Sequence, residues 1–176
     1  MGSGYHAAAM DEIAERAGVS KPVLYQHFPG KLELYLALLD HHARGLLDAV
    51  RGAIASTNDN KQRVTAAIGA YFEFVARDGA PFRLVFESDL TNEPAVRERV
   101  DTMTQESVDA IARVIREDTD LTVPEAQLLA VALSGMAQVC ARSWLAQGAG
   151  MPREDAARLI GQLAWRGLGG FPKIER

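Results

Sequence analysis

Hydrophobic residues along the chain recur at the three- and four-residue spacing of an α-helix. One such stripe runs through Val64, Ala67, Ile68, Tyr71 and Val75, which would place all five side chains on one helix face. No stretch shows the sustained period-2 alternation of β-branched residues that is typical of a strand. The sequence therefore predicts an all-α protein.

Glycine, proline and short polar runs divide this pattern into segments of helical length. Several prolines stand where a helix would begin, in the first turn, where a missing N–H costs little. The predicted helices cover approximately residues 10–17, 21–28, 31–55, 61–78, 81–88, 94–118, 124–147 and 153–168. The helix that starts at Lys31 is long, and we expect it to bridge the two halves of the chain.

Residues 10–28 have the features of a helix-turn-helix, in which two short helices cross over a tight turn. The small side chain of Ala14 permits close approach of the second helix, and Gly18 can adopt the positive φ that the turn requires. Leu24 and Phe28 lie one turn apart and would face inward together. The pattern predicts a pair of helices anchored by these apolar residues.

The second predicted helix carries a polar run that a simple helical hairpin would not need. Its N-terminal end would enter the major groove of DNA, so Lys21 and Pro22 are expected to meet base edges. Gln26, one turn later, could bond a base or a phosphate. Ser20 and Lys31 stand at helix starts, where side chains and backbone N–H groups bind phosphate. For each residue, the alternative is an exposed side chain without a DNA contact.

Residues 13–34 read IAERAGVSKPVLYQHFPGKLEL, which resembles the signature of TetR-family transcriptional regulators, and the resemblance extends over residues 4–39. It implies a helix-turn-helix DNA-binding domain in residues 1–48 and an effector-binding and dimerisation domain in residues 49–176. Tyr25 and His27 match positions that contact phosphates in the family. The implied function is a homodimeric repressor that leaves operator DNA when it binds a small, largely apolar effector.

Large, soft side chains collect in the second half of the chain, and such residues suit an adaptable apolar cavity. Plain core packing explains most of them. The resemblance implies that the effector pocket lies among these helices. The residues predicted as partial lining are Phe72, Phe86, Met103, Met136, Cys140 and Trp144.

The helices predicted at 124–147 and 153–168 are expected to form the dimer interface. The second of them carries an apolar face, including Leu159, Leu163 and Trp165, that is too broad for a helix surrounded by water. A twofold partner would cover that face, and the resemblance implies a four-helix bundle between the two copies.

Composition narrows the other classes of function. The net charge of −4 argues against a protein that coats nucleic acid, although a local basic surface remains possible. No apolar run is long enough to span a bilayer, and no signal peptide opens the chain. The single cysteine, Cys140, excludes an internal disulfide and fits a reducing compartment. We therefore expect a cytoplasmic protein without a membrane partner.

The residues of an enzyme active site are not evident. Cys140 has no histidine near it in sequence and is expected to be a small buried hydrophobe. His41 and His42 are adjacent, so they would point about 100° apart on a helix and could not readily share a metal. The glycines at 167–170 follow a helix rather than a strand, which does not fit a nucleotide-binding loop. We expect no catalytic residue, metal or cofactor.

Two departures from the family pattern concern the start of the chain. The family carries an opening helix before the Gly-Tyr pair, whereas only three residues precede Gly4-Tyr5. Ala8 and Ala9 stand where a capping Ser or Thr is common, and alanine lacks the oxygen that would accept the backbone N–H, at a cost of about 1 kcal/mol. The expectation is a chain trimmed of its first helix.

We accordingly predict that this chain by itself binds DNA poorly, whereas a longer protein with the first helix binds it well. Without the first helix to pack against them, the two short helices of the motif bury too little apolar surface to be stable. The alternative function for this chain is therefore a helical small-molecule-binding dimer that does not bind DNA. An electrophoretic mobility shift by this chain at the full affinity of the longer protein would contradict the prediction.

Overall fold

The computed structural model describes residues 5, 8–77, 90, 92–148 and 150–167. Within these ranges the regular structure is entirely helical. The helices are α1 (Met10–Ala17), α2 (Lys21–His27), α3 (Lys31–Ala55), α4 (Asn60–Ala76), α6 (Pro94–Glu117), α7 (Val123–Ala146) and α8 (Arg153–Arg166). The all-α prediction is confirmed, and the helix predicted over residues 81–88 lies outside the described residues.

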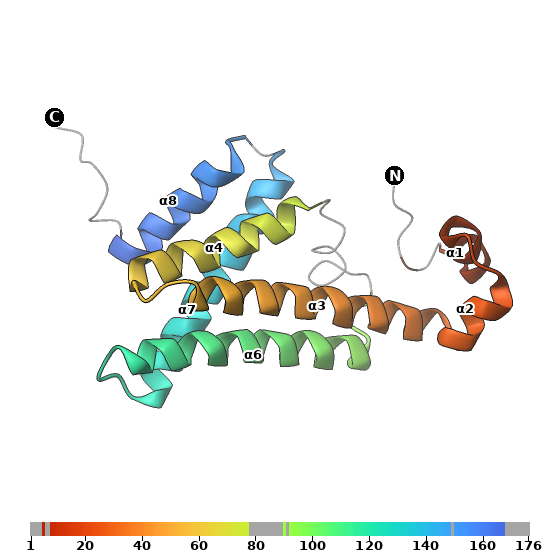
Figure 1. The fold of residues 1–176 in the computed structure, drawn as a ribbon, viewed down its shortest axis with the longest axis horizontal. Helices are drawn as coiled ribbons and strands as arrows, with labels where there is room; N and C mark the ends of the chain where they lie inside the picture. Colours follow the sequence, from red (N-terminus) through yellow and green to blue (C-terminus); the bar gives the residue numbers. More distant parts are fainter. Residues whose placement is uncertain (1–4, 6–7, 78–89, 91, 149, 168–176) are drawn as a thin grey trace.

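Helix α3 is the axis of the molecule. It is 25 residues long, and Figure 1 shows α1 and α2 at one of its ends, with α4 and α6 alongside its remaining length. Helix α7 crosses behind α4 and α6 and leads into α8, which packs against α4. One straight helix therefore connects the small N-terminal unit to the helical core, as the sequence predicted.

The main hydrophobic core lies between α3, α4 and α6 and extends to α7 and α8. Leu39, Leu46 and Val50 of α3 are fully buried and stand at the i, i+7 and i+11 positions of one helix face. Phe72 of α4 is the largest of the fully buried side chains. Because α3 contributes to this core along more than half of its length, its direction is set by the packing of the larger domain.

A second, smaller cluster holds the N-terminal unit together. Met10, Ala14 and Leu24 are buried in it, and partly buried residues of α1, α2 and the start of α3 pack around them. The turn between α1 and α2 depends on Gly18, whose φ is +68° and whose N–H bonds the Glu15 carbonyl at 3.1 Å. The predicted roles of Ala14, Gly18 and Leu24 are confirmed.

The helix starts differ in how their N–H groups are satisfied. Thr122 and Glu125 form a capping box at the start of α7, and Asp59 accepts the Gln62 N–H at 2.8 Å at the start of α4. Ala9 precedes α1 without a side-chain cap, as expected. Ser20 occupies the N-cap position of α2, but its side chain makes no capping bond.

The expected domain boundary between residues 48 and 49 lies inside α3, which continues without interruption to Ala55. The smaller cluster reaches no further along α3 than Leu34. The division into residues 1–48 and 49–176 stays a prediction about function, because the helix that carries the boundary is shared by both units.

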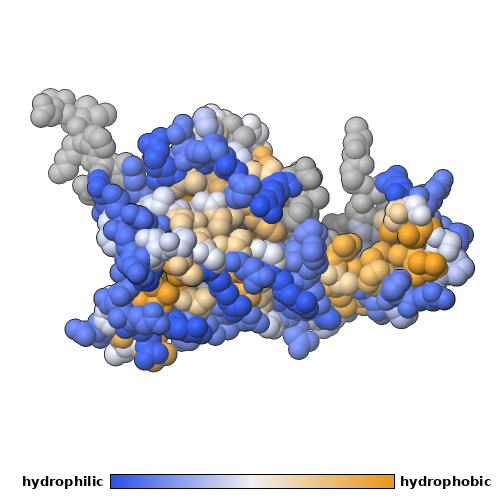
Figure 2. Space-filling model, viewed as in Figure 1, coloured by the Kyte–Doolittle hydropathy of each residue, from blue (hydrophilic) through white to orange (hydrophobic). Residues whose placement is uncertain are grey.

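Apolar side chains also reach the surface. Figure 2 shows an apolar area where α1 and α2 meet the first turns of α3. The expectation that no apolar run is long enough to span a bilayer is wrong for one helix: among the described helices, α7 is long and apolar enough by length and composition alone, although one such helix is weak evidence for a membrane span. Its exposed apolar residues include Leu128, Val131 and Val139, which lie on one side of the helix.

We predict opposite effects for the same substitution at two glycines. Gly18→Ala should destabilise the α1–α2 turn by about 1–2 kcal/mol, because an L-residue is strained in the left-handed region. Gly52→Ala, within α3 and with open space around the added methyl, should stabilise by about 0.5–1 kcal/mol. Chemical denaturation of both variants, with amide exchange in α1 and α2, checks this; equal effects would contradict the role given to Gly18.

Candidate DNA interface and ligand cavity

The polar ridge predicted on the second helix lies on the outside of α2. Leu24 points into the small cluster, and its neighbours on the opposite face are exposed. The exposed predicted DNA-contact residues are Ser20, Lys21, Pro22, Tyr25, Gln26 and His27. The helix can therefore present these six side chains to a groove without unfolding any part of the cluster beneath them.

Lys21 is paired with Asp11 of α1, the Nζ–Oδ2 distance being 2.5 Å. Both side chains are more than half exposed, and such surface pairs contribute little to stability. Exchange of Asp11 for a phosphate or a base edge would therefore cost the protein little.

Lys31 lies apart from the ridge. It is half-buried at the start of α3, and its ammonium donates to the carbonyls of Tyr5 and Ala8 at 2.8 and 2.9 Å. The ammonium also lies 4.5 Å from the centre of the Tyr5 ring, a distance that permits a cation–π interaction. Lys31 thus ties the segment before α1 to α3, and the structure does not bring it together with the other predicted DNA contacts.

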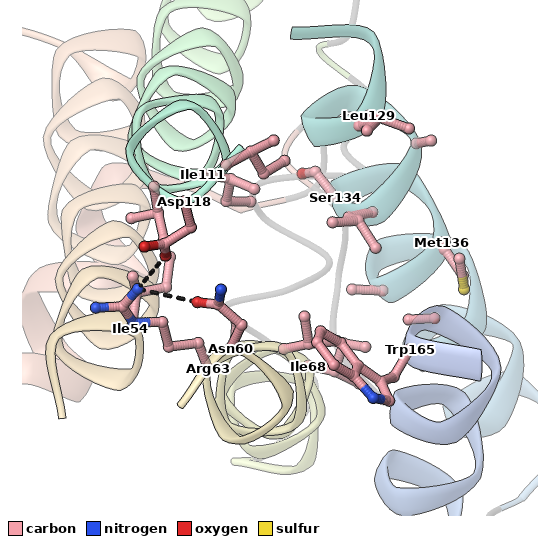
Figure 3. A pocket seen from close by; sticks show the side chains of 18 of the residues that line it. Ile54, Asn60, Arg63, Ile68, Ile111, Asp118, Leu129, Ser134, Met136 and Trp165 are labelled. Atoms are coloured by element: carbon pink, nitrogen blue, oxygen red, sulfur yellow. Dashed lines mark hydrogen bonds and ion pairs between the residues drawn. The ribbon is translucent and has the colours of Figure 1, made fainter. Parts of the chain in front are cut away.

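A cavity of about 680 Å³ lies between α4, α6, α7 and α8. Its walls are mainly aliphatic, with Ile68 of α4, Ile111 of α6 and Leu133 of α7 facing one another across the space. Figure 3 shows Trp165 of α8 beside Ile68, closing one side. The volume is within the range of about 300–1,000 Å³ that small-molecule sites occupy.

Charged groups lie at one edge of this cavity, where α4 begins and α6 ends (Figure 3). Arg63 donates to Asp118 at 2.8 Å and to the Asn60 amide oxygen at 3.0 Å. Arg63 and Asp118 are the only charged side chains among the described residues that line the space. The cavity is thus an apolar chamber with one polar end.

A second polar point lies in the cavity wall, away from this edge. The Tyr71 hydroxyl and the Ser134 hydroxyl are 3.1 Å apart and both residues are buried. Burial raises the pKa of the Tyr71 phenol, while the hydroxyls of Ser134 and Ser107 act in the opposite direction. Tyr71 therefore stays neutral and can donate or accept a hydrogen bond.

The residues predicted as pocket lining lie in different places. Met136 lines the large cavity, whereas Met103 lines a separate space of about 340 Å³ between α3 and α6. Phe72 and Trp144 pack against each other in the core, with ring centres 5.8 Å apart, and Cys140 packs against the same core. Phe86 lies outside the described residues. The structure thus brings only Met136 of this set to the large cavity.

Nucleophilic and metal chemistry has little support in the described part of the chain. Partial burial raises the pKa of the Cys140 thiol, which keeps it in the unreactive protonated form. The rings of His41 and His42 are in contact, with centres 5.2 Å apart. No group of three or more His, Cys, Asp or Glu side chains in the described residues could hold a metal ion.

The sequence carries a signal for the cavity in the apolar stripe of α4 and in the alanines of the helices that face it. Val64, Ala67, Ile68 and Tyr71 of this stripe line the cavity, and Ile68 and Tyr71 are at the same time buried members of the main core. The alanines on the other walls, Ala132, Ala137 and Ala164, are the other part of the signal, since small side chains on facing helices leave space. Arg63 and Asp118 have no sequence signal of their own, because they are 55 residues apart.

Comparison with known proteins covers almost the whole chain. Residues 2–38 match the family described as bacterial regulatory proteins, tetR family. Residues 60–167 match the family described as tetracyclin repressor-like, C-terminal domain. The HTH-type transcriptional activator FasR of Mycolicibacterium smegmatis is 46% identical over 96% of this chain and 77% of its own.

Solved structures share the fold. The transcriptional regulator FadR from Bacillus subtilis, in complex with stearoyl-CoA, has a TM-score of 0.77 at 17% identity, over 94% of this chain and 91% of that one. A tetR-family regulator from Streptomyces coelicolor has a TM-score of 0.74 at 26% identity, over 91% of this chain and 70% of that one.

Proposed function

The chain belongs to the TetR family of transcriptional regulators, and from this we propose that it binds operator DNA as a homodimer under the control of an apolar small molecule. The observation that carries the proposal is that one continuous helix, α3, connects two features. One is the exposed helix-turn-helix ridge, and the other is the core with its aliphatic cavity of about 680 Å³. Operator binding would place the protein in the cytoplasm, with the chromosome.

The DNA-binding part of the proposal assigns the exposed face of α2 to the major groove. Lys21 and Pro22 stand at the N-terminal end of that helix, the end that reaches base edges in helix-turn-helix proteins. Tyr25 and His27 would contact the phosphates on either side. Gln26 offers an amide that can bond a base in a bidentate manner.

The dimer part of the proposal rests on the apolar surface of the last two helices. Leu128 is 70% exposed and Val131 is 53% exposed on α7, and Leu159 and Trp165 are exposed on α8. Such a surface on one copy is unfavourable in water. A four-helix bundle of α7 and α8 with their twofold mates would cover it, which also accounts for the membrane-like composition of α7.

The effector part of the proposal rests on the cavity walls. An aliphatic chamber with few polar groups selects an apolar ligand, because each polar group moved into it without a partner would lose its bonds to water. FadR of Bacillus subtilis, a structural neighbour, holds stearoyl-CoA. We propose a ligand with an alkyl or acyl chain for this protein too.

Ligand and DNA would communicate through α3. Two recognition helices must lie about 34–36 Å apart to meet successive half-sites. A ligand that separates α4 and α6 would tilt α3 between them and change that spacing. The coupling free energy between two such sites is typically about 1–3 kcal/mol.

The sign of regulation depends on more than this chain. A protein bound over a promoter blocks transcription, whereas one bound upstream can favour it. Repression stays a prediction from the family resemblance. The FasR relative is named an activator, which supports regulation in the other direction.

Removal of the Lys21 charge tests the DNA-binding proposal. With a duplex selected by the protein from a random pool, Lys21→Ala should weaken binding by about 1–3 kcal/mol and relax the base preference. Lys61→Ala, which removes an exposed cation at the start of α4, should leave both unchanged. Fluorescence anisotropy at several salt concentrations measures this. Equal losses in both variants would contradict the assignment of α2 to the groove, and failure of the chain to select any duplex would favour the alternative in which it is a ligand-binding dimer that does not bind DNA.

A charge placed on α7 tests the dimer. Leu128→Glu should convert the dimer to monomer at micromolar concentration, because two carboxylates would be buried near the twofold axis without partners. Leu38→Glu, the same change at an exposed site on α3, should remain dimeric. Sedimentation equilibrium distinguishes these outcomes, and a monomeric parent protein would overturn this interface.

A further inference from the structure

The ion pair at the polar edge of the cavity has unequal partners. The Arg63 side chain is 17% exposed and that of Asp118 is 37% exposed. Arg63 is held on several sides, since its Nε donates to the Thr57 carbonyl at 2.8 Å and its Nη1 donates to Asn60 at 3.0 Å. The guanidinium is therefore fixed at the cavity edge whether or not Asp118 is bound to it.

Asp118 is the more easily displaced partner. It is the C-cap residue of α6, and a carboxylate at this end of a helix is disfavoured by the negative end of the helix dipole. Its side chain is close enough to water to be solvated after a rotation. Within the described part of the chain, the Asp118 carboxylate bonds to Arg63 alone.

From this asymmetry we propose that Arg63 is the headgroup site of the cavity. The ligand would have an apolar chain that ends in an oxyanion, a carboxylate or a phosphate. The oxyanion would replace Asp118 on the guanidinium while the chain fills the aliphatic space. The inference rests on the proposed function, since it takes the same cavity as the effector site.

The replacement gives the ligand a direct mechanical effect. The Arg63–Asp118 pair joins the start of α4 to the end of α6. Helix α6 is in turn joined to α3 by Arg51–Glu106 at 3.2 Å and Arg99–Asp40 at 3.0 Å. An oxyanion on Arg63 releases α6 from α4 at one end, so α6 and α3 can shift together and carry the helix-turn-helix with them.

Three ten-carbon probes separate the headgroup from the chain: decanoate, decyl phosphate and decanol. Their dissociation constants are measured on the full chain by calorimetry or by the fluorescence of Trp165, which lines the cavity. Arg63→Gln should weaken decanoate and decyl phosphate by about tenfold to a hundredfold, the effect of losing charge-assisted hydrogen bonds. It should leave decanol unchanged.

Asp118→Asn is the complementary variant, because it removes the carboxylate that competes for Arg63 while Arg63 itself is unchanged. It should strengthen decanoate and decyl phosphate by several-fold and leave decanol unchanged. Arg113→Gln, at an exposed position of α6, is the control and should affect none of the probes. A preference for decyl phosphate over decanoate, or the reverse, identifies the source of the oxyanion.

The outcomes distinguish the two proposals. If decanol binds and the Arg63 and Asp118 variants keep the parent ratio of decanoate to decanol affinity, the headgroup site is wrong and the effector cavity stands. If none of the three probes binds, both proposals are overturned. Circular dichroism of Arg63→Gln establishes that it is folded, and Asp118→Asn decides the question independently if it is not.

Discussion

The packing of α3 in two clusters is the constraint on which the rest of the structure depends. One end of this helix closes the small cluster around Ala14 and Leu24, and the remainder enters the main core through Leu39, Leu46 and Val50. A helix of 25 residues is about 37 Å long at about 1.5 Å per residue. A small tilt at its buried part therefore becomes a larger displacement at the helix-turn-helix.

The cavity follows from the same packing. Helix α4 contacts α3 on one side and α7 and α8 on the other, while α6 packs against α3 and α7. Helices α4, α6, α7 and α8 surround a space whose walls include several alanines. Because neighbouring helices are held apart by their own cores, the alanines cannot approach one another to fill it. An aliphatic ligand can therefore enter without displacing a large core side chain.

The polar groups of the cavity are held by hydrogen bonds to neighbouring residues. Thr57 and Asn60 fix Arg63, and Ser134 fixes Tyr71. Each of these hydrogen bonds joins a cavity residue to a helix end or to another helix. Binding of a polar ligand group is therefore linked to the positions of the helices. This linkage gives the proposed effector a route from a chemical contact to a change in the spacing of the recognition helices.

The sequence by itself determined the helices and the helix-turn-helix. Apolar spacing and Gly/Pro positions are local signals, so every described helix was predicted to within two residues of its observed bounds. Gly18, Ala14 and Leu24 were identified because a tight turn and a close crossing each require one residue type. The exposure of Lys21, Tyr25, Gln26 and His27 followed from the same geometry.

The tertiary structure alone decided which side chains line the cavity and which fill the core. Phe72, Cys140 and Trp144 have the size and softness of lining residues, yet they pack against the core, and only Met136 of the described candidates lies at the large cavity. The difference depends on distances between helices far apart in sequence, which periodicity does not contain. Distances between segments far apart in sequence also decided that Lys31 donates to the Tyr5 carbonyl and that Arg63 pairs with Asp118.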